Sequence, residues 1–429
     1  MPSPIAWWQQ FQDPALDALV TQALASNSSI RAGQASLKQA RALRDARYAS
    51  YLPSVGLRGS ATRTASEFDD GATYLNTGFD ARWELDVFGA NRRNMEASVG
   101  ETQASQAMLR SIQVSVAAEV ALAYIQLRGQ QAQLEIAQRN LASQEETLQI
   151  TRWRAQAGLV TSLEVEQAQS ATAQTAAQIP SLRTQLAKNR HSLAILTGQR
   201  PLALDEALST QAPIPAFQLD PAQAIPANTL RQRPDVRAAE HRVKASLARL
   251  GAAQAARYPS FNLGGSLSLS ALTLTGLTGG ASLAGSLVNS ISLPVINHGT
   301  VQNQILAQEA ALEQAHAAYE STVLGALRDV EDALISLKND QEKLAFVELS
   351  ATAANNAALL AQNRYASGLI DFQVVLQTQR TLLSAQDTVA NLKTDISAHH
   401  VRLIKALGGG WSPTDPPDSP EASPSHSAP

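Results

Sequence analysis

The sequence predicts a mainly α-helical fold with a smaller β part, built from two copies of one plan in which a strand hairpin precedes two long helices. Three features of the first half return about 210 residues later: a Pro-Ser pair before an alternating stretch, a Gly that interrupts a helical region, and a Gly at a helix end. The matching pairs are Pro53 with Pro259, Gly158 with Gly368, and Gly198 with Gly408. So regular a spacing indicates a duplicated unit, and it is too long for a solenoid repeat.

The composition favours an extended helical assembly over a thick globular core, because much of the apolar content is small Ala and the aromatic fraction is only 5%. With 34 basic and 37 acidic residues, the formal charge of −3 gives no indication of nucleic-acid binding. The absence of Cys excludes disulfides, thiolate zinc sites and cysteine nucleophiles. No apolar signal region follows Met1, so we expect either a cytosolic chain or a mature, processed form.

An N-terminal helical segment is predicted over residues 1–50, and the first strand hairpin over residues 51–89. On the second strand of this hairpin, apolar residues alternate with Asp80, Arg82, Glu84 and Asp86. These charges would cost several kcal/mol each in lipid or in a dry core, so their face must meet water. The pattern fits a solvated sheet edge, or a membrane barrel with an apolar exterior and an aqueous lumen. Membrane barrels need about eight strands or more, so several chains would have to share one barrel.

Residues 90–198 are predicted to form the first long helical hairpin. Residues 91–156 contain no Pro, and apolar residues recur at every seventh position from Val120 to Leu148, which predicts a coiled-coil seam. The second helix of the hairpin is expected to be broken only at Pro180. A solid antiparallel bundle would also explain the seam, but a dry interior favours aliphatic residues where this chain has Gln. We therefore predict a water-filled cylinder in which three Gln residues are at least partly solvated: Gln130, Gln131 and Gln138.

Six Pro residues mark residues 199–234 as a non-helical linker with room for a short strand. A helix is predicted over residues 235–257. The second strand hairpin is expected at residues 258–297, where alternating Leu and Ser with many Gly argue against a spanning helix although no charged residue occurs. Residues 298–408 are predicted to form the second long helical hairpin, and the Pro- and Ser-rich residues 412–429 a disordered tail.

Both long hairpins are expected to reverse sharply at a Gly and to carry aliphatic residues at their ends. Exposed aliphatic residues at such an end are typical of a partner contact, although a single exposed Leu more often has no function. The two predicted tips are Gly158, Leu159, Val160 and Thr161 in the first copy, and Gly368, Leu369, Ile370 and Asp371 in the second.

No catalytic constellation is evident. The sequence contains no HExxH, no GxSxG and no phosphate-binding loop ending in GK[ST]. His399 and His400 are adjacent and would lie on different faces of a helix, which disfavours a metal site. The acidic residues around Asp329 lie on a long helix beside Arg328 and are typical of a solvated face. We therefore expect neither an enzyme nor a cofactor nor a bound metal.

Several motifs resemble those of TolC/OprM-type outer-membrane factors, over about residues 7–411. The most specific is the run RPDVRAAE at residues 233–240. The other motifs are AAQAARYPS at 252–260, WELDVFG at 83–89 followed by Arg92-Arg93, FQDP at 11–14, and LGGGW at 407–411.

This resemblance implies a homotrimer in which three chains of four strands form a twelve-stranded outer-membrane barrel that continues into a periplasmic α-helical barrel. In such proteins the segments corresponding to 1–50 and 199–234 lie at the equator of the helical barrel. The family is the exit duct of tripartite efflux pumps, and it carries drugs or other small molecules passively to the exterior. It docks with a periplasmic adaptor, or membrane fusion, protein and with an inner-membrane transporter of the RND type. The expected surroundings are outer-membrane lipid and the periplasm, and the hairpin tips are the expected adaptor contact.

The resemblance also implies a periplasmic gate. Tyr365 and Arg380 match a Tyr and an Arg with which the family ties neighbouring helices shut. The residue three before that Arg is usually Asp and belongs to an acidic ring, but here it is Gln377, which predicts a weaker bond to Arg380. Glu164 and Glu166 are the carboxylates that could replace it. Many members carry a lipidated Cys at the mature N-terminus, so this chain is expected to be a trimmed lipoprotein or unlipidated.

Two other functions fit part of the sequence. A trimeric coiled-coil surface or adhesion protein also combines long helices with a membrane barrel anchor, but it needs one anchor per chain, whereas strand hairpins recur here in both halves. A soluble α-helical pore-forming protein would keep its apolar hairpin inside a watertight fold until triggered. Conductance of lipid vesicles with untriggered chain would distinguish this possibility.

Overall fold

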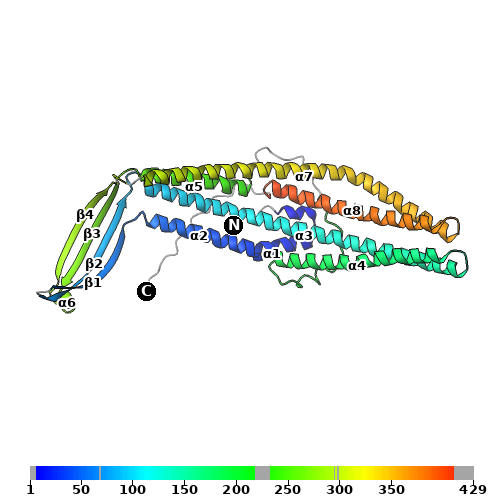
Figure 1. The fold of residues 1–429 in the computed structure, drawn as a ribbon, viewed down its shortest axis with the longest axis horizontal. Helices are drawn as coiled ribbons and strands as arrows, with labels where there is room; N and C mark the ends of the chain where they lie inside the picture. The colour runs from blue at the N-terminus through cyan, green and yellow to red at the C-terminus, as the bar shows by residue number, and fades with distance from the viewer. Residues whose placement is uncertain (1–5, 67–68, 218–231, 294, 297–298, 410–429) are drawn as a thin grey trace. The chain divides into compact units, whose positions relative to one another are not determined.

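The computed structural model describes residues 6–66, 69–217, 232–293, 295–296 and 299–409. The predicted tail at 412–429 and part of the predicted linker, residues 218–231, lie outside the described residues. The described elements in chain order (Figure 1) are η1 (Trp7–Phe11), α1 (Pro14–Ser26), α2 (Ser28–Ala49), β1 (Ser54–Ser66), β2 (Asp69–Leu85), α3 (Ala90–Gln156), α4 (Ser162–Leu196), α5 (Pro234–Ala255), β3 (Ser260–Ala271), α6 (Gly276–Gly279), β4 (Ser282–Ser292), α7 (Thr300–Ala366) and α8 (Phe372–Ala406).

The two halves follow the same plan at nearly the same lengths. Each half has two strands, then a long helix, then a shorter helix. The long helices α3 and α7 both have 67 residues, and their partners α4 and α8 both have 35 residues. A helix of 67 residues extends about 100 Å at 1.5 Å per residue, far beyond the usual length of a globular helix.

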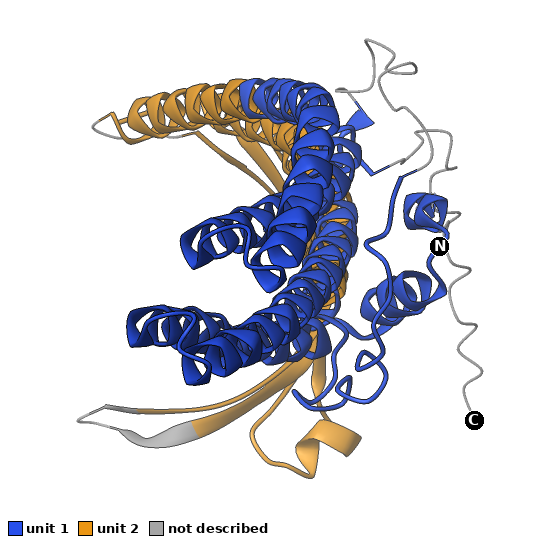
Figure 2. Cartoon of the chain, turned by 90° about the vertical axis from the view of Figure 1, so that its right-hand side faces the viewer, with its two compact units in different colours: residues 1–32, 109–234, 323–429 blue, residues 33–108, 235–322 orange. Residues whose placement is uncertain are grey.

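The chain divides into two compact units, coloured separately in Figure 2. Unit 1 comprises residues 1–32, 109–234 and 323–429, and unit 2 comprises residues 33–108 and 235–322. The long helices α3 and α7 each begin in unit 2 and end in unit 1. Unit 2 holds the strands, whereas unit 1 holds both helical hairpin ends, the N-terminal helix and the described part of the linker.

In unit 2 the four strands form one antiparallel sheet in the order β1-β2-β3-β4. The central pair, β2 and β3, joins the two copies of the repeat. The register aligns Leu57 with Phe79, Phe79 with Leu267 and Leu267 with Gly285, so one face of the sheet is lined by apolar residues across all four strands. The neighbouring row aligns Gly56, Asp80, Ser266 and Ser286, on the opposite face.

The helices of unit 2 lie beside one another in the same order as the strands. The Thr102 hydroxyl of α3 lies 3.3 Å from the Ala40 carbonyl oxygen of α2, and Arg249 of α5 forms a 2.7 Å ion pair with Glu101 of α3. On the other side of α5, Arg257 donates to Gln302 of α7. Close approach of α3 and α5 depends on Gly100, where an added Cβ would lie 3.1 Å from the Ala245 side chain.

The structure corrects the predicted role of Asp86. The alternation predicted it as the last charge on the polar strand face, but β2 ends at Leu85. The Asp86 carboxylate instead accepts hydrogen bonds from the backbone N–H groups of Asn91 and Arg92 at 3.0 and 2.8 Å, in the first turn of α3. The Tyr51 hydroxyl also donates to it, at 2.8 Å. Asp86 therefore accepts hydrogen bonds from backbone N–H groups at the start of α3 that have no partner within the helix. The alternating sequence pattern cannot distinguish a residue in this position from one more residue of the strand.

In unit 1 a buried polar network attaches the N-terminal segment and the linker to α3. Asp13 caps α1 by accepting from the backbone N–H of Ala15 at 2.9 Å, and its other oxygen accepts from the Tyr124 hydroxyl at 2.7 Å. Arg128 donates to that hydroxyl and to the Thr210 carbonyl oxygen. Burial and Asp13 raise the pKa of Tyr124, although Arg128 opposes the shift, so the hydroxyl stays protonated and can donate.

This network overturns one of the three predictions of solvated Gln residues. Gln138 is exposed and Gln130 is half-buried, but Gln131 is only 5% exposed. Its amide donates to the Leu208 carbonyl oxygen at 3.0 Å and accepts from Arg128 at 2.7 Å. Gln131 is buried because the linker covers α3 there, and linker position is not encoded in a heptad pattern.

One further expectation about unit 1 is wrong. The second helix of the first hairpin is not broken at Pro180, because α4 is a single helix with Pro180 inside it, exposed on its surface. A kink or local carbonyl displacement can accommodate a Pro on an open helix face. The described part of the linker, 199–217, is non-helical as predicted and has consecutive turns over residues 201–209, and the remainder of the segment with room for a strand lies outside the described residues.

Candidate functional site

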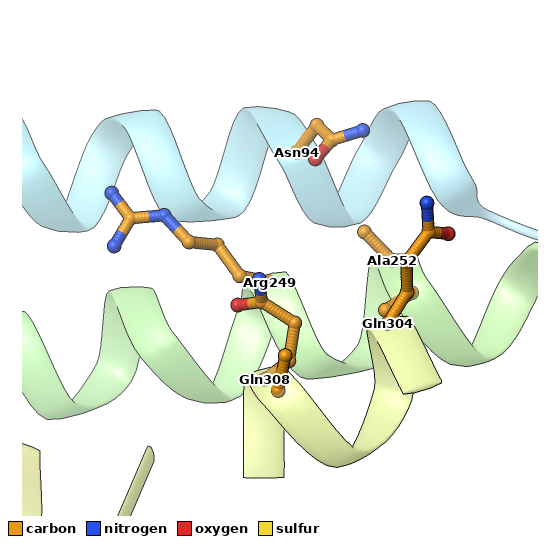
Figure 3. Close-up of a pocket in the computed structure, with 7 residues that line it drawn as sticks. Asn94, Arg249, Ala252, Gln304 and Gln308 are labelled. Atoms are coloured by element: carbon orange, nitrogen blue, oxygen red, sulfur yellow. The ribbon is translucent and has the colours of Figure 1, made fainter. Parts of the chain in front are cut away.

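No arrangement in the described residues resembles a catalytic centre. A groove of about 500 Å³ in unit 2 lies among α3, α5 and α7 (Figure 3). Its polar side chains are the amides of Asn94, Gln304 and Gln308 and the guanidinium of Arg249, which is paired with Glu101. These groups offer neither a nucleophile nor an acid and base pair. Within the described residues, no three His, Asp or Glu side chains lie close enough to hold a metal ion.

The sheet of unit 2 instead has two chemically different faces, one apolar and one polar. On the apolar face, Leu57 is 71% exposed and Leu287 is 78% exposed in the single chain. A soluble protein rarely exposes contiguous apolar surface of this kind, so this face requires a nonpolar environment. On the opposite face Arg58 forms a 3.2 Å ion pair with Asp80, and the hydroxyls of Ser266 and Ser286 lie 2.8 Å apart.

Aromatic side chains lie where the strands meet the helices. The rings of Phe88 and Tyr258 stack at 4.7 Å, and Phe261 lies 6.3 Å from Phe88. The indole N–H of Trp83 donates to the Tyr51 carbonyl oxygen at 3.1 Å. Tyr and Trp with a satisfied polar end and an exposed apolar body are typical of a membrane interface.

The helical hairpins end in matching glycine turns. Gly158 and Gly368 have φ of +71° and +75°, a conformation that residues with a side chain rarely adopt. In both turns two backbone bonds close the helix: Gly158 N to Ala155 O and Leu159 N to Arg154 O, each at 2.9 Å in the first copy. This is the Schellman arrangement. The same pair recurs at Gly368 and Leu369.

Both predicted tips therefore lie at the ends of tight hairpins. Leu159 is 68% exposed and Leu369 is 73% exposed, so each presents an aliphatic side chain to solvent. Val160 is half-buried, and Ile370 packs partly against a buried cluster near the tip. Thr161 and Asp371 occupy the N-cap positions of α4 and α8, and neither side chain caps its helix.

Near the tips, Tyr365 connects the two hairpins of one chain. It is 1% exposed and lies in a cluster with residues of α3, α4 and α8, including Phe372 at 5.7 Å. Its hydroxyl lies 3.1 Å from the Thr151 hydroxyl of α3 and 3.5 Å from the Glu164 carboxylate of α4. Burial raises the pKa of Tyr365, and the Glu164 charge adds to the shift, so the phenol is neutral at neutral pH.

The other two predicted gate residues do not join Tyr365. Arg380 and Gln377 are both exposed on α8, and no hydrogen bond or ion pair connects either to Tyr365 in the described residues. Glu166 is also exposed.

Sequence reasoning missed Arg154. Its guanidinium lies 4.4 Å over the Tyr365 ring and donates to the Tyr365 carbonyl oxygen at the end of α7. A cation over an aromatic face and a cation at a helix C-terminus are both favourable. Nothing in the sequence around Arg154 distinguishes it from the neighbouring Arg152, because the contact joins residues about 210 positions apart.

A second missed feature is a neutral polar ladder between α3 and α8. The Gln379 amide donates to the Thr147 hydroxyl at 3.0 Å, and the Asn140 amide donates to Gln386 at 2.8 Å. Farther from the tips, the Gln133 amide bonds to Asn391. The seven-residue spacing of Gln133, Asn140 and Thr147 on α3 was the available signal, but it could not identify the partner helix.

Comparison with known proteins gives a consistent result along the chain. The family model of the outer membrane efflux protein matches residues 19–199 and 225–409. The chain is 32% identical over 415 residues to the probable efflux pump outer membrane protein SepC of Pseudomonas putida, covering 94% of this chain and 85% of the relative. The toluene efflux pump outer membrane protein TtgF of the same species matches equally well.

Solved structures agree with these relatives. The outer-membrane channel OprN superimposes with a TM-score of 0.90 at 36% identity, covering 94% of this chain and 92% of OprN. The outer membrane protein VceC of Vibrio cholerae superimposes with a TM-score of 0.88 at 28% identity, covering 96% of this chain and all of VceC. The relatives are channel proteins rather than enzymes, and the comparisons give no support to the adhesion alternative. The chain therefore belongs to the outer membrane efflux protein family and is an outer-membrane channel of an efflux pump, with its helical part in the periplasm.

Proposed function

We propose that three copies of this chain form one continuous duct, with a twelve-stranded barrel in the outer membrane and a helical barrel in the periplasm. The sheet register carries this proposal. One face of the sheet is apolar on all four strands, and β1 and β4 each pair with only one strand in the described chain. Open strand edges in lipid would cost several kcal/mol for each unpaired backbone group, and pairing β4 of one chain with β1 of the next removes both edges.

The curvature of unit 1 supports the helical part of the duct. Figure 2 shows the long helices of unit 1 as a curved layer, with the N-terminal helix and the linker on its convex side. In the proposed trimer the concave sides face a common axis. The exposed residues on the concave side of α8 are mostly polar, as a water-filled passage requires.

The duct conducts passively, and its partners supply the energy. SepC and TtgF are named as components of efflux pumps, and TtgF as part of a toluene pump. For this chain we propose small organic solutes, including drugs, as cargo. A periplasmic adaptor contacts the exposed Leu159 and Leu369 at the hairpin tips, and an inner-membrane transporter of the RND type delivers the cargo.

The periplasmic end closes where the hairpins converge. Within one chain Tyr365 holds α7 to α3 and α4, through Thr151 and Glu164. Arg380 is exposed and directed to no partner in the described chain, so we propose that it closes the gate by binding a neighbouring chain. The neutral Gln377 lies on the same face of α8, three residues before Arg380, and makes that closure weaker than an Asp would.

A combined measurement of mass and conductance tests this function. Light scattering of the detergent-solubilised chain, corrected for detergent, should give three times the 45.6 kDa of one chain. The same preparation should conduct ions in planar lipid bilayers without any trigger. A monomer that still conducts would contradict the shared barrel, and a trimer that never conducts, even with Tyr365 and Arg380 replaced, would contradict the duct.

A further inference from the structure

A recess of about 570 Å³ in unit 1 contains more cationic than anionic side chains. It lies between α7 and α8 and is lined by Arg233, Arg328, Asp329, Asp332, Ala333, Ser336, His399, Arg402, Lys405 and Ala406. Four of these side chains are cations and two are carboxylates. The channel function assigns no role to this cluster.

The two carboxylates are already neutralised by two of the cations. Asp329 lies 3.3 Å from both Arg233 and Arg328, and Asp332 lies 4.0 Å from Arg328. Arg233 is 9% exposed and donates to the Ala406 carbonyl oxygen at 2.9 Å, at the C-terminal end of α8. These contacts make Arg233 part of the framework of the recess.

Arg402 and Lys405 supply the surplus charge. In the described chain neither has a carboxylate partner, and Arg402 donates only to Nδ1 of His399, at 3.1 Å. Nε2 of His399 lies 3.1 Å from the Asp340 carboxylate, so the imidazole separates that charge from Arg402. Arg402 is exposed and Lys405 is half-buried, and both can therefore reach a ligand in the recess.

The exposed part of the recess lies on the side of α8 opposite linker residues Pro215 and Phe217, whereas Arg233, at the end of the linker, forms its floor. The Ser397 hydroxyl donates to the Pro215 carbonyl oxygen at 2.6 Å, and the His400 ring stacks on Phe217 at 5.0 Å. His399 and Arg402 each follow one of these residues by two positions, which places them about 200° around the helix. Since linker residues 199–217 lie on the convex side of unit 1 (Figure 2), the opposite side of α8, with His399 and Arg402, faces the concave side.

We infer that this recess is a binding site for anionic solutes in the wall of the duct, and that Arg402 and Lys405 carry it. The inference rests on the proposed function for its location in the lumen. Guanidinium and ammonium groups bind carboxylate and phosphate oxygens through charge-assisted hydrogen bonds. The wall is not uniformly basic, because Asp395 lies exposed two turns before Arg402 on the same side of α8. Attraction is therefore confined to the level of the recess.

Ion selectivity provides the first test. The full chain is inserted into bilayers of uncharged lipid, and the reversal potential is measured in a KCl gradient. The double variant Arg402→Gln/Lys405→Gln should lower the relative permeability of chloride by about twofold, because the local anion concentration falls with the surplus charge. The matched control is Lys393→Gln, which removes a cation from the linker side of α8, where Lys393 forms a 2.7 Å pair with Glu348. The control should not shift the reversal potential.

Citrate binding to detergent-solubilised protein provides a second test that needs no conductance. Calorimetric titration at low ionic strength should detect citrate binding to the wild type and to Lys393→Gln, with at least about tenfold weaker binding to the double variant. The charge-conserving Arg402→Lys/Lys405→Arg should retain binding. Equal citrate binding by wild type and Arg402→Gln/Lys405→Gln would overturn the site. If citrate binding depends on Arg402 and Lys405 but the protein does not conduct ions, the proposed anion site stands and the proposed duct is contradicted.

Discussion

At the scale of single residues, Tyr365 of α7 contacts the other three hairpin helices, α3, α4 and α8, near the hairpin ends. Its hydroxyl contacts Thr151 and Glu164, and Arg154 covers its ring. Because burial raises the pKa of Tyr365, the phenol remains neutral through the pH range of the periplasm. The attachment of the two hairpins should therefore not loosen when the pH changes between about 5 and 8.

We expect Tyr365→Phe to raise the open probability of the channel. The ring still fills the cluster, so the change removes only the hydroxyl bonds, each worth about 1 kcal/mol, in all three chains of the proposed trimer. Adding Arg380→Ser should raise it further by removing the proposed contact between chains. Single-channel recording measures the effect. The same open probability in wild type and the double variant would exclude both residues from the gate.

Gln377→Asp should have the opposite effect. It places a carboxylate three residues before Arg380 on one helix face, and a charged acceptor bonds more strongly than an amide. We expect a lower open probability than in wild type and the appearance of a pH dependence, with opening as the pH falls and the new carboxylate protonates. Recording at pH 4 and pH 7 tests this expectation, with Gln377→Asn as the uncharged control. No difference between the Asp and Asn variants would contradict it.

Asp86 gives a stability prediction with a defined sign. Burial raises its pKa, but the backbone N–H groups of Arg92 and Asn91 and the Tyr51 hydroxyl outweigh this effect and hold the pKa below its usual value. A lowered pKa in the folded state means that Asp86 contributes stability above the unfolded pKa of about 3.9 and loses it as the pH falls through the folded value. We expect Asp86→Ala to lower the free energy of unfolding by about 1 kcal/mol at pH 7.

The measurement is thermal unfolding of the detergent-solubilised protein at pH 7 and at pH 2.5. The difference between wild type and Asp86→Ala should shrink at the lower pH, because the wild-type carboxylate is then increasingly protonated. Asp45→Ala is the matched control, since among the described residues Asp45 pairs only with the neighbouring Arg44, on the exposed surface of α2. A pH-independent difference would mean that the Asp86 charge does not stabilise the start of α3.

At the scale of elements, the glycine turns determine where the long hairpins end. Gly368 has positive φ, and any L side chain there is strained whatever the free space. We expect Gly368→Val to disturb the reversal and abolish efflux, whereas Gly368→Asn should retain most activity because Asn tolerates the left-handed region. Efflux is measured as drug accumulation in cells that lack other outer-membrane channels. Full efflux with Gly368→Val, at equal amounts of protein in the outer membrane, would contradict the proposed adaptor docking at the tip.

The two faces of β4 permit a matched comparison. Leu287 lies on the apolar face and is 78% exposed in the single chain, whereas Ser286 lies on the polar face. Leu287→Arg places a charge in lipid at a cost of about 2 to 4 kcal/mol near the bilayer centre, while Ser286→Arg places it in the aqueous lumen. We expect only Leu287→Arg to reduce the amount of folded protein in outer-membrane fractions. Equal reduction by both variants would show that the apolar face does not meet lipid.

At the scale of the whole molecule, duplication of one unit explains how the chain forms a four-stranded sheet and a layer of adjacent helices. Each copy supplies two strands and two helices, and the pairing of β2 with β3 joins the copies into one four-stranded sheet. The helices of unit 2 follow the same order through contacts of α3 with α2 and α5. A lateral array with two open edges can then be extended by further copies of the same chain.

The sequence by itself determined the periodic features of this protein. Alternation identified both strand hairpins, glycine spacing located both helix reversals, and local motifs indicated the family, because each of these signals depends on residues close together in the chain. Tertiary structure decided the rest. Burial of Gln131 under the linker, the Arg154 contact with Tyr365 and the cap formed by Asp86 all depend on which distant or irregular segments meet. The surplus charge of Arg402 and Lys405 likewise became visible only in the folded chain, where Asp329 pairs with Arg233 and Arg328, and no carboxylate of the described residues forms an ion pair with Arg402 or Lys405. Pairing across helices depends on three-dimensional proximity and not on local pattern.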